Sequence, residues 1–87
     1  MISRDEAMTI AEELFEREVR PGDAGLVVDA ENVEEKGSTL IVPFNYPEFL
    51  ETRDAHVMAL DCWPIIVDLE SGNARVTSMA DRGFLNS

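Results

Sequence analysis

The sequence predicts a two-layer α+β domain, in which one N-terminal helix packs on a four-stranded, mainly antiparallel sheet. Apolar residues recur at helical spacing in the first part of the chain, and runs with strand alternation begin at Leu26, Leu40 and Ile65. A polar turn, Ser71-Gly72-Asn73, joins the last two strands. A helix with one apolar stripe and a sheet with one apolar face can bury each other. The 87 residues are expected to form a single domain, residues 1–87, with one small core.

The N-terminal helix is predicted from its start signal, its stripe and its stop signal. Ser3-Arg4-Asp5-Glu6 fits a capping box, and Arg20-Pro21-Gly22 ends the helix because proline lacks the amide that the helix needs. The apolar stripe consists of Ala7, Ile10, Ala11, Leu14, Phe15 and Val19. We expect Leu14 and Phe15 to pack against sheet residues, namely Leu40, Val42 and Ile65 or Val67.

The first two strands are predicted around a short turn. Leu26-Val27-Val28 opens the first strand, and Val33 breaks its alternation, which predicts a bulge or an end of the strand near Glu31-Asn32. Glu35-Lys36-Gly37-Ser38 is predicted to be a hairpin turn into the second strand, Leu40–Phe44.

The second strand contains Pro43, so it is expected to lie at an edge or to have its amide side unpaired there. The third strand is expected over Ile65–Leu69 and the fourth over Ala74–Met79. Ile41 and Ile66 fall on the second face of the sheet, which leaves a monomer and a homodimer both open.

The segment from Tyr46 to Trp63 is too long for a hairpin turn and too irregular for a helix, so we expect a long loop. Its aromatic residues are either interface anchors or pins that hold the loop to the core. General burial preferences favour exposure for Tyr46 and a core role for Phe49 and Trp63. The candidate partner-binding residues are Tyr46, Glu48, Phe49, Glu51, Asp54, His56, Asp61 and Trp63.

The charge balance restricts the partners that this chain can bind. Seven basic residues stand against 18 acidic ones, which gives a net charge of −11. Phosphate recognition needs clustered Lys and Arg, so the composition argues against nucleic acid and against anionic membranes. The acidity serves either solubility or the attraction of a basic partner.

The residue types argue against an enzyme. Cys62 and His56 are the only Cys and His, and the chain has neither an oxyanion motif nor a glycine-rich phosphate loop. A metal site from Asp54, His56, Asp61 and Cys62 would mix hard and soft ligands without a known spacing. We therefore expect no catalytic residue, no metal and no cofactor. One cysteine, no signal-peptide pattern and no apolar run of membrane-spanning length predict a cytoplasmic protein.

Three pieces of the chain carry a resemblance to a known family. They are Pro43-Phe44-Asn45, Phe49-Leu50-Glu51-Thr52-Arg53-Asp54, and Pro64-Ile65-Ile66-Val67-Asp68 with the following Gly72. In this order they resemble the immunity-protein-35 (YrhB-like) family of small bacterial proteins, over roughly residues 3 to 80. Where that family usually has Gly-Asn before the proline, this chain has Asp61-Cys62.

The resemblance implies a function in bacterial competition. Members of that family are encoded beside polymorphic toxins, often with papain-like peptidase domains, and are taken to protect the producing cell by binding the toxin. It implies that this chain binds a cognate toxin, with a basic contact surface, and occludes its active site. A chaperone-like or stress-related protein that binds unfolded clients is the alternative that the same resemblance allows.

Overall fold

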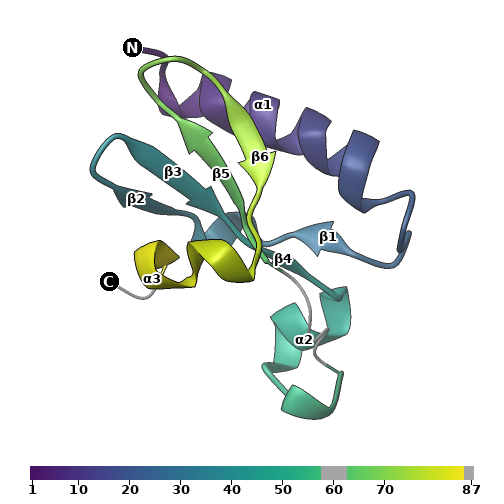
Figure 1. Ribbon diagram of the computed structural model, residues 1–87. Coiled ribbons are helices and arrows are strands. Elements are labelled where there is room, and N and C mark those ends of the chain that lie inside the picture. Colours follow the sequence, from purple (N-terminus) through teal and green to yellow (C-terminus); the bar gives the residue numbers. More distant parts are fainter. Residues whose placement is uncertain (58–62, 86–87) are drawn as a thin grey trace.

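The computed structural model describes residues 1–57 and 63–85 and confirms the α+β class. An N-terminal helix, α1 (Arg4–Leu14), lies along one face of a four-stranded antiparallel sheet (Figure 1). In the part of the chain that the structure describes, no helix has the length and apolar character needed to cross a membrane.

The N-terminal helical segment, α1 together with the turn that follows it, begins and ends where the sequence predicts. The Ser3 hydroxyl accepts a hydrogen bond from the Glu6 amide at 3.1 Å, which is one half of the expected capping box. After Leu14 the helix widens into a π-helical turn, η1 (Phe15–Val19), which closes with the Arg20 amide on the Phe15 carbonyl at 2.9 Å. Pro21 then prevents continuation.

The four-stranded sheet has the order β2-β3-β5-β6, and every pair is antiparallel. Its strands are β2 (Glu34–Lys36), β3 (Thr39–Val42), β5 (Ile65–Asp68) and β6 (Ala74–Val76). The hairpin across Ser71-Gly72-Asn73 confirms the predicted pairing of the last two strands, with Gly72 at φ 79°.

Two strand assignments from the sequence are wrong. Residues 34–36, assigned in part to a turn, form the outer strand β2, and the turn is shorter because Gly37 adopts φ 62°. The expected first strand is the short β1 (Val27–Val28), which belongs to a separate two-stranded sheet with β4 (Phe44–Asn45). It ends at Val28, earlier than predicted, and a 3₁₀ turn, η2 (Ala30–Asn32), occupies the position where the sequence predicted a bulge or an end.

Pro43 explains the division into two sheets. It has no amide to donate and separates β3 from β4, so the run that looked like one strand pairs with two different partners. β3 therefore lies inside the main sheet, between β2 and β5, and not at an edge. The Pro43 carbonyl accepts from the Asp29 amide at 2.9 Å.

The core lies between α1 and the sheet, as predicted. Phe15 and Phe44 meet with ring centroids 5.5 Å apart. The buried cluster comprises Ala7, Ala11, Leu14, Phe15, Leu26, Leu40, Val42, Phe44, Ile65, Val67 and Leu69.

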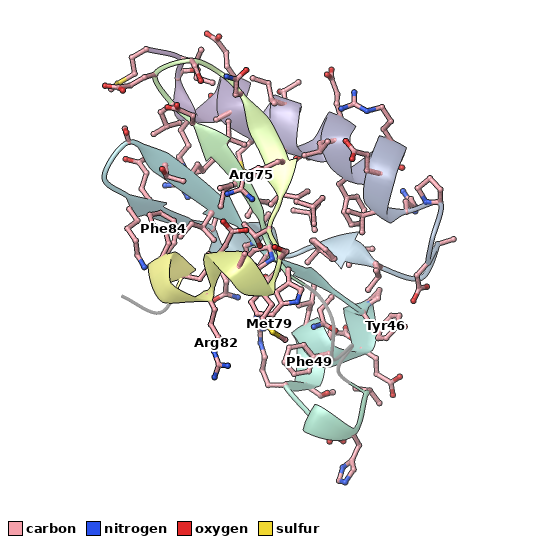
Figure 2. All side chains as sticks on the ribbon, viewed as in Figure 1. Tyr46, Phe49, Arg75, Met79, Arg82 and Phe84 are labelled. Carbon is pink, nitrogen blue, oxygen red and sulfur yellow. The ribbon has the colours of Figure 1, made fainter. Side chains whose placement is uncertain are left out.

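The C-terminal segment lies on the second face of the sheet. The sequence predicted that the fourth strand would continue to Met79, which is wrong for the residues after β6. After β6 the chain turns at Ser78 into η4 (Met79–Asp81) and α3 (Arg82–Leu85), on the side of the sheet away from α1 (Figure 1). Arg75 of β6 binds Asp81 through both terminal nitrogens, while Lys36 Nζ of β2 donates to the Phe84 carbonyl at 2.9 Å. The segment thus connects both edges of the sheet. Met79 stays 71% exposed, and Arg82 projects into solvent (Figure 2).

We predict that acid loosens this C-terminal segment. Hydrogen bonds from Arg75 and from the Ser78 amide lower the pKa of Asp81 from 3.8 to about 2. Because the folded pKa lies below the ordinary value, the stabilising effect is complete above pH 3.8 and is lost as pH falls through about 2. The Ser78 amide donates to Asp81 at 2.9 Å, so its protection, taken as its exchange rate relative to that of an unprotected amide at the same pH, should fall across that range. In Asp81→Asn the same amide should exchange rapidly already above pH 3.8. An identical pH dependence in both proteins would contradict the assignment.

Candidate functional site

The segment that the sequence reading treated as a loop forms a short helix, α2 (Pro47–Thr52), followed by a 3₁₀ turn, η3 (Ala55–Val57). Pro47 occupies the first turn, where its missing amide costs nothing. The expectation of an irregular loop is wrong for these residues, because six helical residues are too few to show a period of 3.6. Together α2 and η3 project from the helix-sheet body (Figure 1).

Arg53 ends α2 in a left-handed conformation, with φ 56° and ψ 27°. Among the described residues it is the only one other than glycine with positive φ. Its amide donates to the Phe49 carbonyl at 2.6 Å, and its guanidinium lies 5.4 Å from the centre of the Phe49 ring. The left-handed conformation strains the backbone of a residue other than glycine, so contacts of Arg53 with its surroundings must stabilise it.

An ion pair with Asp29 stabilises Arg53 in this conformation. Both terminal nitrogens of Arg53 lie 3.3 Å from Asp29 Oδ2, and the Asp29 side chain is only 8% exposed. The Asn32 side-chain amide donates to both oxygens of the same carboxylate, at 3.1 and 2.9 Å. This cluster ties the end of α2 to the turn after β1.

Two substitutions of Arg53 distinguish how much the ion pair and the backbone strain each contribute to stability. Arg53→Ala should destabilise the fold by about 1 to 2 kcal/mol, less than for a fully buried pair because Arg53 is half exposed. Arg53→Gly loses the same pair but relieves the left-handed backbone, so it should be about 1 kcal/mol more stable than Arg53→Ala. Urea unfolding of both variants tests this. Equal stability of the two variants would show that the backbone at residue 53 is not strained.

Tyr46 fixes the start of α2. Its hydroxyl donates to Asp23 Oδ2, and its ring lies beside Gly25. Tyr46 is half-buried and packs against the core cluster, so the expectation that it is exposed is wrong. The hydrogen bond from Tyr46, with a second from the Gly25 amide, lowers the pKa of Asp23. The Asp23 carboxylate therefore stays charged and keeps accepting both hydrogen bonds at neutral pH.

The outward surface of α2 and η3 is acidic. Glu48, Glu51 and Asp54 are exposed, and within the described part of the chain neither glutamate makes an ion pair or a hydrogen bond through its side chain. The His56 side chain is 95% exposed, with Nδ1 3.0 Å from Asp54 Oδ1. We call Glu48, Glu51, Asp54 and His56 the α2 surface. The structure thus brings four of the eight sequence-predicted site residues onto the exposed surface of one projecting unit, which also contains the half-buried Phe49.

The other predicted residues have different positions. Phe49, a residue of α2, is half-buried and lines a hollow of about 360 Å³ with Ile41 and Pro43 (Figure 2). Trp63 is half-buried and lines another hollow, of about 480 Å³, with Leu26 and Val76. Asp61 lies outside the described residues, as does Cys62.

Comparison with known proteins finds no match. No family model, curated protein or solved structure matches this chain. Among residues 1–57 and 63–85, no group of three or more His, Cys, Asp or Glu side chains is arranged to hold a metal ion.

Sequence reasoning missed the residues that position α2. Asp29 and Arg53 are 24 positions apart, so no local pattern connects them. Two local signals were present. Asp29 and Asn32 have the spacing of a side-chain-stabilised turn, and Asp23 precedes Gly25 as in an Asx turn, with the Gly25 amide 3.0 Å from Asp23 Oδ1.

Proposed function

We propose that this chain is a binding protein, without catalytic activity of its own, that engages a basic surface of another protein through the α2 surface. One observation carries the proposal. The exposed carboxylates of Glu48 and Glu51 stand on a helix whose two ends are fixed to the body, by Tyr46 with Asp23 and by Arg53 with Asp29. Arg53, at the end of the same helix, is engaged by Asp29 and forms no ion pair with either glutamate among the described residues.

This arrangement suits recognition in two ways. Carboxylates that face solvent attract a basic partner from a distance and accelerate the encounter. A helix that is already formed and anchored loses little conformational entropy when it binds. Both effects favour a fast and stable complex.

The resemblance to the immunity-protein-35 family supports a toxin as the partner. On this proposal the α2 surface covers the active site of a polymorphic toxin, of papain-like or other peptidase type, and protects the cell that makes both proteins. The motif piece Phe49-Leu50-Glu51-Thr52-Arg53-Asp54, which carries part of that resemblance, includes two residues of the α2 surface, Glu51 and Asp54.

Co-expression with the product of the neighbouring gene tests the proposal. The chain should bind that product in a stoichiometric complex and abolish its toxicity. The double variant His56→Ala, Cys62→Ala should protect equally well, because binding alone is required. Loss of protection by a folded double variant that still binds would indicate chemistry at these residues. Weak suppression of aggregation of many unrelated proteins, without selective binding, would instead favour the chaperone-like alternative.

A further inference from the structure

Strand β1 has an open edge. Among residues 1–57 and 63–85 it pairs only with β4, with Val27 opposite Asn45 and Val28 opposite Phe44. The Asp29 amide donates to the Pro43 carbonyl, so in the alternating antiparallel pattern Val28 is in a non-hydrogen-bonded pair. Its N–H and C=O therefore point away from β4. Within the described residues no backbone hydrogen bond outside the ladder engages them.

A hollow of about 370 Å³ adjoins β1. The apolar side chains of Phe15, Val27 and Val28 contribute to its lining. The remaining lining residues come from α1 and η1 and the residue after them: Thr9, Glu12, Glu13, Glu16 and Arg20. The hollow thus combines an apolar lining with an unpaired strand edge.

The charges that face this hollow are mostly negative. Glu16 is neutralised by Arg20, with Arg20 Nη1 2.5 Å from Glu16 Oε1. Glu12 and Glu13 are exposed, and neither has a side-chain partner in the part of the chain that the structure describes. The net negative charge at this site is complementary to lysine or arginine.

We propose that this hollow docks an extended basic segment of the partner, which adds as a strand to β1. Side chains alternate along a strand, so Val27 and Val28 face opposite sides, and an alternating segment would place its apolar side chains beside one of these valines and its cationic ones within reach of Glu12 and Glu13. Val28 also lines a second hollow, shared with Leu50 and Glu51 of α2. The docked segment would therefore continue toward the α2 surface. This inference rests on the proposed function, because the hollow beside β1 and the α2 surface would engage the same partner.

A synthetic peptide tests this without the natural partner. The probe is a short peptide of alternating lysine and valine, and its control is the same peptide methylated on every backbone nitrogen, which keeps the charge but has no backbone donor. The unmodified peptide should bind the full chain at low salt and slow the exchange of the Val28 amide. The methylated peptide keeps its lysine donors but lacks backbone N–H groups, so it should bind about tenfold more weakly, because strand addition needs those backbone donors.

Matched variants distinguish the effect of the two glutamates at this hollow from the effect of the overall negative charge of the protein. Glu12→Gln with Glu13→Gln should weaken peptide binding about five- to tenfold. Glu35→Gln with Glu70→Gln removes the same charge from β2 and from the β5–β6 turn, and it should leave the affinity close to that of the parent. Equal weakening by both pairs, or equal affinity of both peptides, would overturn the proposal.

Two further outcomes are informative. Protection of the Val28 amide that rises with protein concentration, without peptide, would show that a second copy of this chain occupies the edge, and it would also overturn the proposal. Failure of the peptide test, while substitutions on the α2 surface still weaken binding of the toxin, would refute this groove and leave the proposed function standing.

Discussion

Reversing the carboxylates of the α2 surface is expected to produce the largest change in binding. The variant Glu48→Lys, Glu51→Lys, Asp54→Lys should associate with a basic partner about 10 to 1,000 times more slowly at low salt. These side chains face solvent, so their charges act on the approaching partner while the core contacts stay intact. Stopped-flow association at several salt concentrations measures the effect, which should shrink as salt rises.

A control variant with the same net charge makes this result specific. Glu6→Lys, Glu35→Lys and Glu70→Lys reverse three exposed acids away from α2, and Glu6 matches Glu48 because both lie in the first turn of a helix. The control should slow association far less than the α2 variant. Similar slowing by both would show that net charge alone, and not the α2 surface, attracts the partner.

Truncating Leu14 is expected to cause the largest loss of stability. Leu14 is 3% exposed and belongs to the cluster that joins α1 to the sheet. Leu14→Ala should cost about 2 to 5 kcal/mol, through lost burial and the cavity that remains. A domain of this size has only about 5 to 10 kcal/mol in total, so the melting temperature should fall by about 10 °C or more.

Glu13→Ala is the matched control for that substitution. Glu13 is the preceding residue of α1 and is exposed, so its truncation should change stability by less than about 0.5 kcal/mol. Thermal and urea unfolding of the two variants can be compared directly. A melt of Leu14→Ala that matches the parent would show that α1 is not part of the core.

The fold class and the core were predictable because they depend on periodic patterns. The apolar stripe that includes Leu14 and Phe15 identified the buried face of α1, and alternation in Ile65–Asp68 identified the buried face of β5. Strand pairing was less predictable. Alternation gives the face of a residue but not its partner strand, so the break at Pro43 did not reveal that β4 leaves the main sheet to pair with β1.

The sequence analysis also failed to predict the short helices and the ion pair between residues far apart in the sequence. The capping box between Ser78 and Asp81 is a start signal of the kind recognised at Ser3, and it would have identified the turn into α3. At α2 the prediction of a partner-binding region rested on residue types, and the structure adds the geometry. The contact between Asp29 and Arg53 could not be anticipated, because it depends on how the two-stranded sheet places residues far apart in sequence.

Hydrogen exchange on the complex tests the central claim most directly. The complex with the proposed toxin partner is compared with the free protein, amide by amide. We predict new protection across residues 47–57, where α2 and η3 present the α2 surface. Protection confined to the β5–β6 hairpin or to the C-terminal segment, with α2 exchanging as fast as in the free protein, would contradict the claim.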